Sequence, residues 1–332
     1  MASADNPAAR PRLLFTRAAM LSEHSWGRVA KKRPRTEALW EIAAKSLVER
    51  EPSVVVVHEG HYASVALQVL RRRLPRHTKI IYWVHNSVSR AIRRPELRYQ
   101  LSAADLVVCV SKFMSAHIHD RAGRVDSPVV SILNGTSDTV ASPLRSAGGD
   151  LRIIYVGKVQ HHKGLHVLLE ALRRLDAKTQ ATISLRVLGG AVHGPEAHTS
   201  NYEAEMRALA SKLHSDVAFL GWLDPAAVAE HRAWANLIAI PSVFGDPCPL
   251  VVAEALASGL PILTTGAGGI SEQVGAAGIL ASGPDAMATA IRVLSQEPGE
   301  IARYSQASLE RSQMITWEKQ YMKFLEAVDR LP

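Results

Sequence analysis

The sequence has 332 residues, of which 47% are apolar, and its formal net charge is +8. This length exceeds that of a usual single core, so we expect a globular protein of two domains. Only two cysteines occur, which excludes a disulfide framework and fits a reducing compartment. No apolar run approaches the ~18 residues that a membrane span requires.

The positive charge is concentrated in the first half of the chain. Residues 1–150 contain 23 Lys and Arg against 13 Asp and Glu, whereas the remainder contains 16 against 18. The arginines of two runs are Arg71, Arg72, Arg73 and Arg76, and then Arg90, Arg93, Arg94 and Arg98. Such runs are either solvated faces or attract an anionic membrane surface. They are not interleaved with aromatic residues, so nucleic acid is not an expected partner.

The first half alternates predicted strands and helices. A short strand over 12–16 is followed, after an irregular basic segment, by a helix over 37–49. SVVVVHEGHYAS then predicts a buried strand that runs into a polar loop, with a helix over 62–74 behind it. HEGH lacks the helical spacing of a zinc motif, so acceptor contact or plain loop polarity is the better interpretation of His58, Glu59 and His61.

Three further segments complete this half. KIIYWVHNS predicts a strand that ends at His85, and AADLVVCVSKFMSAHI predicts a strand followed by a helix that Ser111 caps. VVSILNGTSD predicts an apolar strand that ends in Asn134 and Gly135. Residues 139–150 are rich in Gly, Ser and Pro without periodicity, which is typical of an interdomain linker.

The second half begins with LRIIYVGKVQHHKGLHVLLEALRRL, which predicts a strand, a loop with Lys158 and Lys163, and an amphipathic helix. Two cations beside a helix N-terminus can stabilise a diphosphate leaving group, although a solvated turn is the alternative for a lysine pair. ISLRVLGGA and VAFLGWLD predict two more strands. This alternation is typical of a doubly wound parallel sheet, and helices over 284–294 and 317–331 are expected beyond it.

The stretch PSVFGDPCPLVVAEALASGLPILTTGAGGISE, residues 241–272, contains the densest pattern. A buried strand precedes it, a helix is expected over 249–258, and ILTT predicts a second buried strand that ends in GAGG. Asp246 lies in the loop before the helix and Glu254 lies about one turn inside it. Both acids could therefore face one cleft, and GAGG lies at the strand edge where open α/β sheets bind ligands. The alternative is that Glu254 only caps or salt-bridges a surface helix and that GAGG is only a turn.

This stretch resembles the acid-x7-acid signature of the retaining, GT-B-fold glycosyltransferases of family four, which use nucleotide-sugar donors. The loop with Gly157, Lys158, Lys163 and Gly164 resembles the same family's G-[RK]-x4-K-G pattern. Two departures stand out. Asp246 stands where the family usually has Glu, whose side chain is one methylene longer. No glycine pair follows the first predicted strand, so a shortened N-terminal domain is expected.

The resemblance implies roles for particular residues. Its catalytic set is His85, beside the transferred bond, Lys158 and Lys163, on the diphosphate, and Asp246, on the sugar. Its donor-binding set is Asn134, Gly157, Trp222, Leu223, Cys248, Leu250, Val251, Glu254, Gly268 and Gly269. Within it, Trp222 or Leu223 is expected under the base and Glu254 on the ribose. No D-x-D triplet occurs, so neither a metal nor another cofactor is expected.

We therefore expect two Rossmann-like domains that face a cleft: residues 1–138, which bind the acceptor, and 151–312, which bind the donor. Residues 139–150 link them, and 313–332 form a helix that crosses back to the first domain. The expected reaction is retaining transfer of a hexose to a glycan, a glycolipid or a soluble small molecule. The alternative is a nucleotide-sugar-binding protein without transferase activity. The start lacks an apolar signal core, so we expect a cytoplasmic protein, at most peripheral at the inner membrane face.

Overall fold

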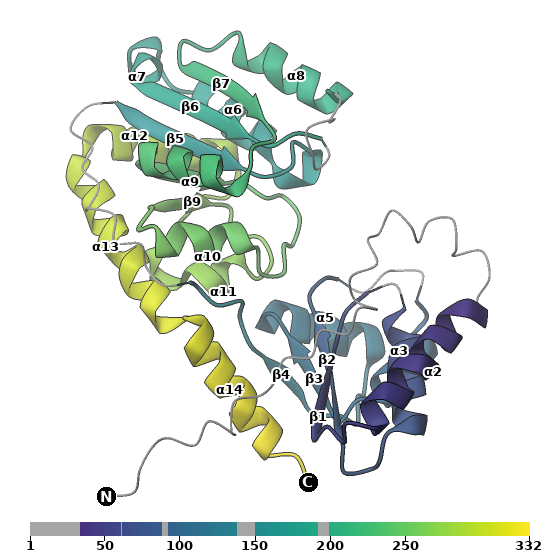
Figure 1. The fold of residues 1–332 in the computed structure, drawn as a ribbon. Coiled ribbons are helices and arrows are strands. Elements are labelled where there is room, and N and C mark those ends of the chain that lie inside the picture. Colours follow the sequence, from purple (N-terminus) through teal and green to yellow (C-terminus); the bar gives the residue numbers. More distant parts are fainter. Residues whose placement is uncertain (1–33, 61, 88–91, 138–149, 192–198) are drawn as a thin grey trace, which may run out of the picture.

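The computed structural model describes residues 34–60, 62–87, 92–137, 150–191 and 199–332, and it contains two parallel sheets. One sheet belongs to the first domain (34–137) and the other to the second domain (150–314). Two long C-terminal helices follow: the first (298–314) runs along the second domain, and the next (317–329) runs back to the first domain (Figure 1). The expected short strand over 12–16 and the linker over 139–149 lie outside the described residues. The expected GT-B arrangement of two Rossmann-like, parallel-sheet domains is confirmed.

The sheet of the first domain has four strands in the order β1-β2-β3-β4. They are β1 (Val54–His58), β2 (Lys79–Val84), β3 (Leu106–Cys109) and β4 (Val129–Ser131). Alternate residues of β2 face opposite sides, because side chains alternate along a strand. Ile80 and Tyr82 pack with the helices that connect the strands, whereas Ile81 packs with the C-terminal helix. Both faces of this sheet are thus covered.

The connecting helices of the first domain are α2 (Pro34–Val48), α3 (Ala63–Arg73), α4 (Arg94–Leu101) and α5 (Lys112–Ala122). Ser111 caps α5 as expected, because its hydroxyl accepts the Met114 N–H at 3.2 Å. On the other face lies α14 (Trp317–Asp329), whose Phe324 packs against Ile81, Leu106 and Val108. The C-terminal helix therefore closes the core of the first domain.

The sheet of the second domain has six strands in the order β10-β9-β8-β5-β6-β7. The strands are β5 (Leu151–Val156), β6 (Ile183–Leu188), β7 (Asp216–Gly221), β8 (Leu237–Ile240), β9 (Ile262–Thr264) and β10 (Gly278–Leu280). The order reverses between β5 and β8, which are neighbours although 80 residues separate their ends. In open α/β sheets this switch point opens a crevice at the carboxyl ends of the strands.

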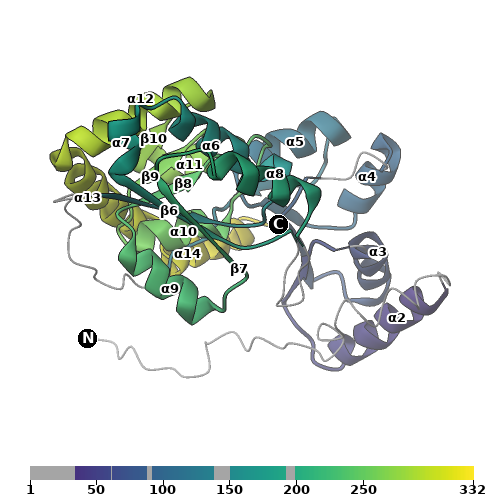
Figure 2. The same ribbon diagram turned by 90° about the horizontal axis from the view of Figure 1, so that it is seen from above.

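Helices cover both faces of this second sheet (Figure 2). One face carries α6 (Leu165–Arg173), α8 (Asn201–Ala210) and α12 (Gly283–Gln296), and the other carries α9 (Pro225–Trp234), α10 (Leu250–Ala257) and α11 (Ile270–Val274). A short α7 (Ala177–Ala181) precedes β6, and single 3-10 turns occur at His161–Lys163 and Gly275–Ala277. Helix α13 (Pro298–Met314) was not predicted from the sequence. No helix of the described residues has the length and apolarity to cross a membrane.

Most arginines of the two basic runs have partners where they are described. Arg71 pairs with Asp105 at 2.9 Å, Arg72 with Glu37 at 2.6 Å and Arg73 with Glu41 at 2.6 Å. Arg93 pairs with Glu96 at 2.8 Å, and Arg98 donates to the Ala122 carbonyl at 2.6 Å. The positive charge that these two runs offer to an anionic membrane surface is therefore smaller than the count of arginines suggests.

Candidate active site

The loops after β5 and β8 meet at the switch point of the second sheet. The first loop, residues 157–164, ends in a 3-10 turn and in Gly164, which has a φ of +76°. A Cβ on Gly164 would lie 1.8 Å from the Pro241 carbonyl oxygen, so only glycine allows the two loops to approach. The Val243 N–H donates to the His162 carbonyl at 3.0 Å. Backbone contacts thus hold the loops together.

Lys163 and Asp246 form an ion pair across this junction, between Nζ and Oδ2. The side chains are 30% and 15% exposed, so both charges are partly desolvated. The structure brings together two residues that were predicted to act on different parts of a donor. Lys158 lies in the same loop, where its carbonyl accepts the Tyr155 hydroxyl at 2.8 Å.

The glycine loop after β9 is attached to the acidic loop. Gly268 forms an isolated bridge with Asp246, and the Gly269 N–H donates to the Asp246 carbonyl at 2.8 Å. A Cβ on Gly269 would lie 1.8 Å from the Pro247 carbonyl oxygen. The Gly269 N–H is thus bonded to the protein backbone, and the donor-binding role of Gly269 stays a prediction. The close approach explains why glycine is needed there.

Cys248 and Asn134 join the second domain to the first. The Asn134 side-chain amide donates to the Cys248 carbonyl at 2.7 Å, and the Asn134 N–H donates to the Cys248 Sγ at 3.4 Å. Burial raises the pKa of the Cys248 thiol to about 12, so this thiol is neutral and inert. Nearby, the Lys112 N–H donates to a Glu272 carboxylate oxygen at 2.7 Å. These bonds fix the domains beside the acidic loop.

Glu254 lies on α10, where its Oε2 accepts a 2.7 Å bond from Nη1 of Arg232 on α9. The Glu254 side chain is 48% exposed, whereas Arg232 is 15% exposed. Sequence analysis did not identify Arg232, because its partner is 22 residues away on another helix. Leu250 and Val251 begin α10, and Leu250 is exposed. Trp222 is exposed just after β7, and Leu223 beside it packs on the core.

His85 follows β2 at the carboxyl edge of the first sheet. Its Nε2 lies 2.8 Å from Nδ1 of His58, the last residue of β1. A carboxylate oxygen of Glu59 accepts the backbone N–H groups of His85 and Asn86, at 2.8 and 2.5 Å. Sequence analysis left His58 and Glu59 open between acceptor contact and plain loop polarity, and it did not pair His58 with His85. The His85 contacts described here are all made within the first domain.

The pKa of His85 is lowered to about 4 by burial and, second, by the nearby His58. Between about 4 and 6.5 the unfolded chain therefore binds a proton that the folded protein does not, so stability falls as the pH is lowered through this window. Burial raises the pKa of the Glu59 carboxyl group, so this group makes stability rise as the pH is lowered and partly offsets His85. We expect denaturant unfolding to show a shallower loss on acidification for His85→Phe than for the wild type. Equal slopes would contradict this assignment.

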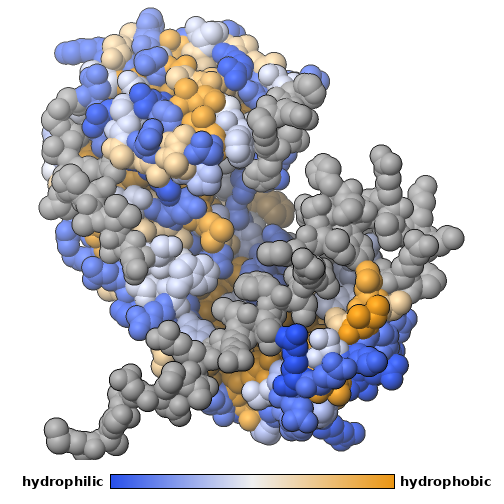
Figure 3. Space-filling view, in the orientation of Figure 1, coloured by the Kyte–Doolittle hydropathy of each residue, from blue (hydrophilic) through white to orange (hydrophobic). Residues whose placement is uncertain are grey.

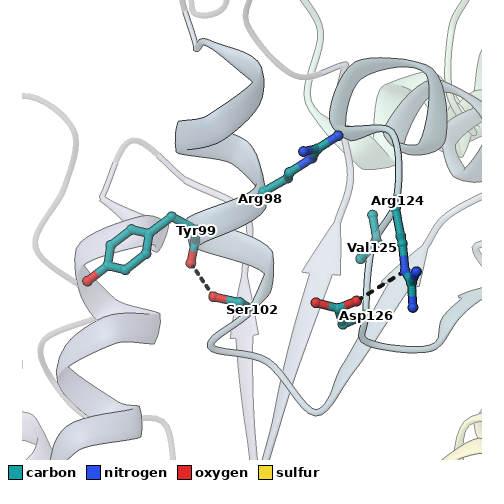
Figure 4. Close-up of a pocket in the computed structure, with 6 residues that line it drawn as sticks. All are labelled: Arg98, Tyr99, Ser102, Arg124, Val125 and Asp126. Carbon is teal, nitrogen blue, oxygen red and sulfur yellow. Dashed lines mark hydrogen bonds and ion pairs between the residues drawn. The ribbon is translucent and has the colours of Figure 1, made fainter.

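A surface hollow also occurs elsewhere in the first domain, lined by Arg98, Tyr99, Ser102, Arg124, Val125 and Asp126 (Figure 4). These residues precede β3 and β4, so the hollow lies at the amino ends of the strands. Ligands of parallel sheets bind at the opposite edge. The surface is also hollowed where the two domains face each other (Figure 3). The loops described above follow the carboxyl ends of the strands. The interdomain hollow is therefore the candidate site.

Comparisons with known proteins agree with this geometry. Residues 150–297 match the family model of glycosyl transferases group 1, and residues 5–139 match that of Glycosyltransferase Family 4. Lipopolysaccharide 1,2-N-acetylglucosaminetransferase of Salmonella typhimurium is 25% identical over 68% of this chain and 58% of its own length. Glycogen synthase of Mycobacterium tuberculosis is 27% identical over 69% of this chain and 54% of its own length. The chain thus spans little more than half the length of these relatives.

Among solved structures, Anabaena HepE in complex with UDP has a TM-score of 0.73. It is 20% identical, and the match covers 89% of this chain and 82% of that one, which shows a shared fold. The two family models together cover most of the sequence, and each falls on one of the two parallel-sheet domains. The chain therefore belongs to the glycosyltransferases of the GT-B fold, with a Family 4 domain followed by a group 1 domain.

Proposed function

We propose that the protein is a retaining glycosyltransferase that moves a hexose from a nucleoside-diphosphate sugar to a glycan or glycolipid acceptor. The observation that carries this proposal is the junction at the β5/β8 switch point, where Lys163 pairs with Asp246 in the loop that leads into α10. A cation beside a helix N-terminus suits a diphosphate, and an acid next to it suits sugar hydroxyls. The UDP bound to Anabaena HepE, which shares the fold, supports a nucleotide donor.

The ion pair gives Lys163 two roles in this proposal. Without donor, each charge neutralises the other, because an unpaired charge with little solvent exposure is costly. A bound diphosphate competes with Asp246 for the ammonium group, and the released carboxylate then accepts hydrogen bonds from the sugar. As the bond from the anomeric carbon to the diphosphate breaks, Lys163 and Lys158 stabilise the negative charge that accumulates on the leaving oxygen.

No described carboxylate is assigned as a nucleophile. The acceptor therefore attacks the anomeric carbon from the same face from which the diphosphate departs. The acceptor hydroxyl forms the new bond to the anomeric carbon, and its proton leaves with the diphosphate. His85, at the carboxyl edge of the first sheet, is assigned to contact the sugar from the first domain. This arrangement keeps the anomeric configuration without a covalent intermediate.

The purified protein should be incubated with a panel of nucleotide sugars, with and without glycan, glycolipid and small-molecule acceptors. We expect release of nucleoside diphosphate that depends on the acceptor, and a product with the anomeric configuration of the donor. Binding of a nucleotide sugar without transfer to any acceptor would instead show a binding protein. A product of inverted configuration would contradict the retaining mechanism.

Glu254 provides a separate test of the donor site. We expect Glu254→Gln to weaken binding of the free nucleoside diphosphate by ~10-fold or more, since hydrogen bonds to charged groups contribute about 1.5–3 kcal/mol. Calorimetric titration measures this affinity directly. The matched control is Glu300→Gln, because Glu300 also pairs with an arginine, Arg303 at 2.6 Å, but on α13. Equal affinity of the wild type and Glu254→Gln would refute the ribose role.

A further inference from the structure

His58 and His85 form a hydrogen-bonded pair at the carboxyl edge of the first sheet. Their facing nitrogens are 2.8 Å apart, and their rings stack with centroids 5.1 Å apart. The indole of Trp83 stacks on both rings, with centroid distances of 5.8 Å to His58 and 6.3 Å to His85. Phe324 of α14 stacks behind this indole at 5.5 Å. The pair therefore rests on an aromatic support that includes the C-terminal helix.

The charged groups near the pair come from two elements. Glu59, at the end of β1, bonds to the backbone N–H groups of His85 and Asn86 and so fixes the turn that carries the imidazole. His117 of α5 interacts electrostatically with Glu59 and lowers the pKa of that carboxyl group, against the larger effect of burial. Neighbouring residues thus hold both the backbone and the side chain of His85.

We propose that His58 is a positioning residue for His85: its hydrogen bond fixes the orientation and the tautomer of the His85 ring towards the sugar being transferred. This inference rests on the proposed function. One proton is shared between the two facing nitrogens, because two N–H groups would repel and two lone pairs would make no bond. The tautomer of His58 therefore sets the function of the second nitrogen of His85, which is a donor when His58 donates to the pair and an acceptor when His58 accepts.

The exposure of His58 separates this role from core packing. The His58 side chain is exposed, although Val57 beside it is buried. A side chain that faces solvent contributes little to the core, so its replacement should leave the fold largely intact. Its one described polar contact is the bond to His85. Loss of that bond should therefore change the chemistry of His85 rather than the stability of the domain.

Kinetics of three variants test the proposal. His58→Phe keeps a stacking ring without the hydrogen bond. We expect kcat to fall on the order of 10-fold, the low end of the scale found for residues that orient a metal-binding histidine, with little change in KM. His58→Asn places an amide near the former Nδ1 and should restore most of this loss. His77→Phe, an exposed histidine at the opposite edge of the sheet, is the control and should be unchanged.

A second measurement does not depend on activity. In ligand-free protein near neutral pH, the ¹⁵N shifts of the two His85 ring nitrogens should be well separated in the wild type and in His58→Asn, and should converge in His58→Phe as tautomers exchange. Unchanged shifts in His58→Phe would overturn the proposal. So would a loss of kcat that His58→Asn does not restore. If the wild type transfers no sugar, the proposed function fails, whereas the shifts still decide the role of His58.

Discussion

Replacing Lys163 by alanine is expected to lower turnover by at least ~100-fold, which is the usual scale for removing one preorganised charge stabiliser. Lys163 is the cation at the β5/β8 junction, and its ammonium group contacts Asp246 in the ligand-free protein. The measurement is kcat at saturating donor and acceptor, and thermal unfolding shows whether the fold survives. Lys178→Ala, an exposed lysine on α7, is the matched control. An active Lys163→Ala enzyme with unchanged kinetics would refute the assignment.

The partner acid requires a further control, because Lys163→Ala leaves Asp246 only 15% exposed and unpaired. An unpaired carboxylate there could distort the loop and lower activity indirectly. In the double variant Lys163→Ala, Asp246→Asn, the stranded charge is removed as well. We expect stability to recover but turnover to stay low, because the cation and the carboxylate proposed to hold the sugar are then both missing. Recovery of turnover would mean that Lys163→Ala loses activity because the Asp246 carboxylate is left unpaired, and not because the cation is missing.

Gly164→Ala is expected to have the largest effect on stability. Gly164 has a φ of +76° and its Cβ would meet the Pro241 carbonyl oxygen at 1.8 Å. Gly221 is a close match in backbone conformation, with a φ of +69°, but nothing lies within 4 Å of its Cβ. Gly221→Ala should therefore cost only about 1–2 kcal/mol for the left-handed backbone. Gly164→Ala should cost a further ~1–3 kcal/mol, because the β8 loop must move.

Denaturant unfolding of both variants measures this difference in free energy. The same displacement separates Lys163 from Asp246, so turnover should fall in Gly164→Ala as well. Equal destabilisation by the two substitutions would show that the loops can separate easily. The close approach at Pro241 would then not be what holds the junction together.

The sequence by itself determined the local elements that carry the site. Strands such as Val54–His58, Lys79–Val84 and Leu151–Val156 are short runs of β-branched and aromatic residues, and their signal lies within each run. The first of them was predicted to be buried, but it lies at the edge of its sheet and only Val57 is buried. The polar residues and glycines that follow these runs marked the loops at the carboxyl edges. Because ligands of parallel sheets bind at those edges, the candidate residues could be predicted without coordinates.

Helix α13 was not predicted from the sequence, for a physical reason. Its buried positions are Ile301, Ser305, Ser308 and Ser312, which follow a helical spacing but include only one apolar residue. The Ser305 and Ser308 hydroxyls donate to the Gly259 and Leu260 carbonyls at 2.8 Å each. A stripe of small polar side chains gives no hydrophobic periodicity, although it packs closely against another helix.

Only the tertiary structure decided which residues meet. Lys163 and Asp246 are 83 residues apart, and Asn134 and Cys248 are 114 apart. They meet because β5 lies beside β8 and the two domains face each other, and this strand order leaves no trace in local periodicity. The ion pair at the β5/β8 junction and the histidine pair on the first sheet therefore follow from the fold, whereas the residues that form them follow from the sequence.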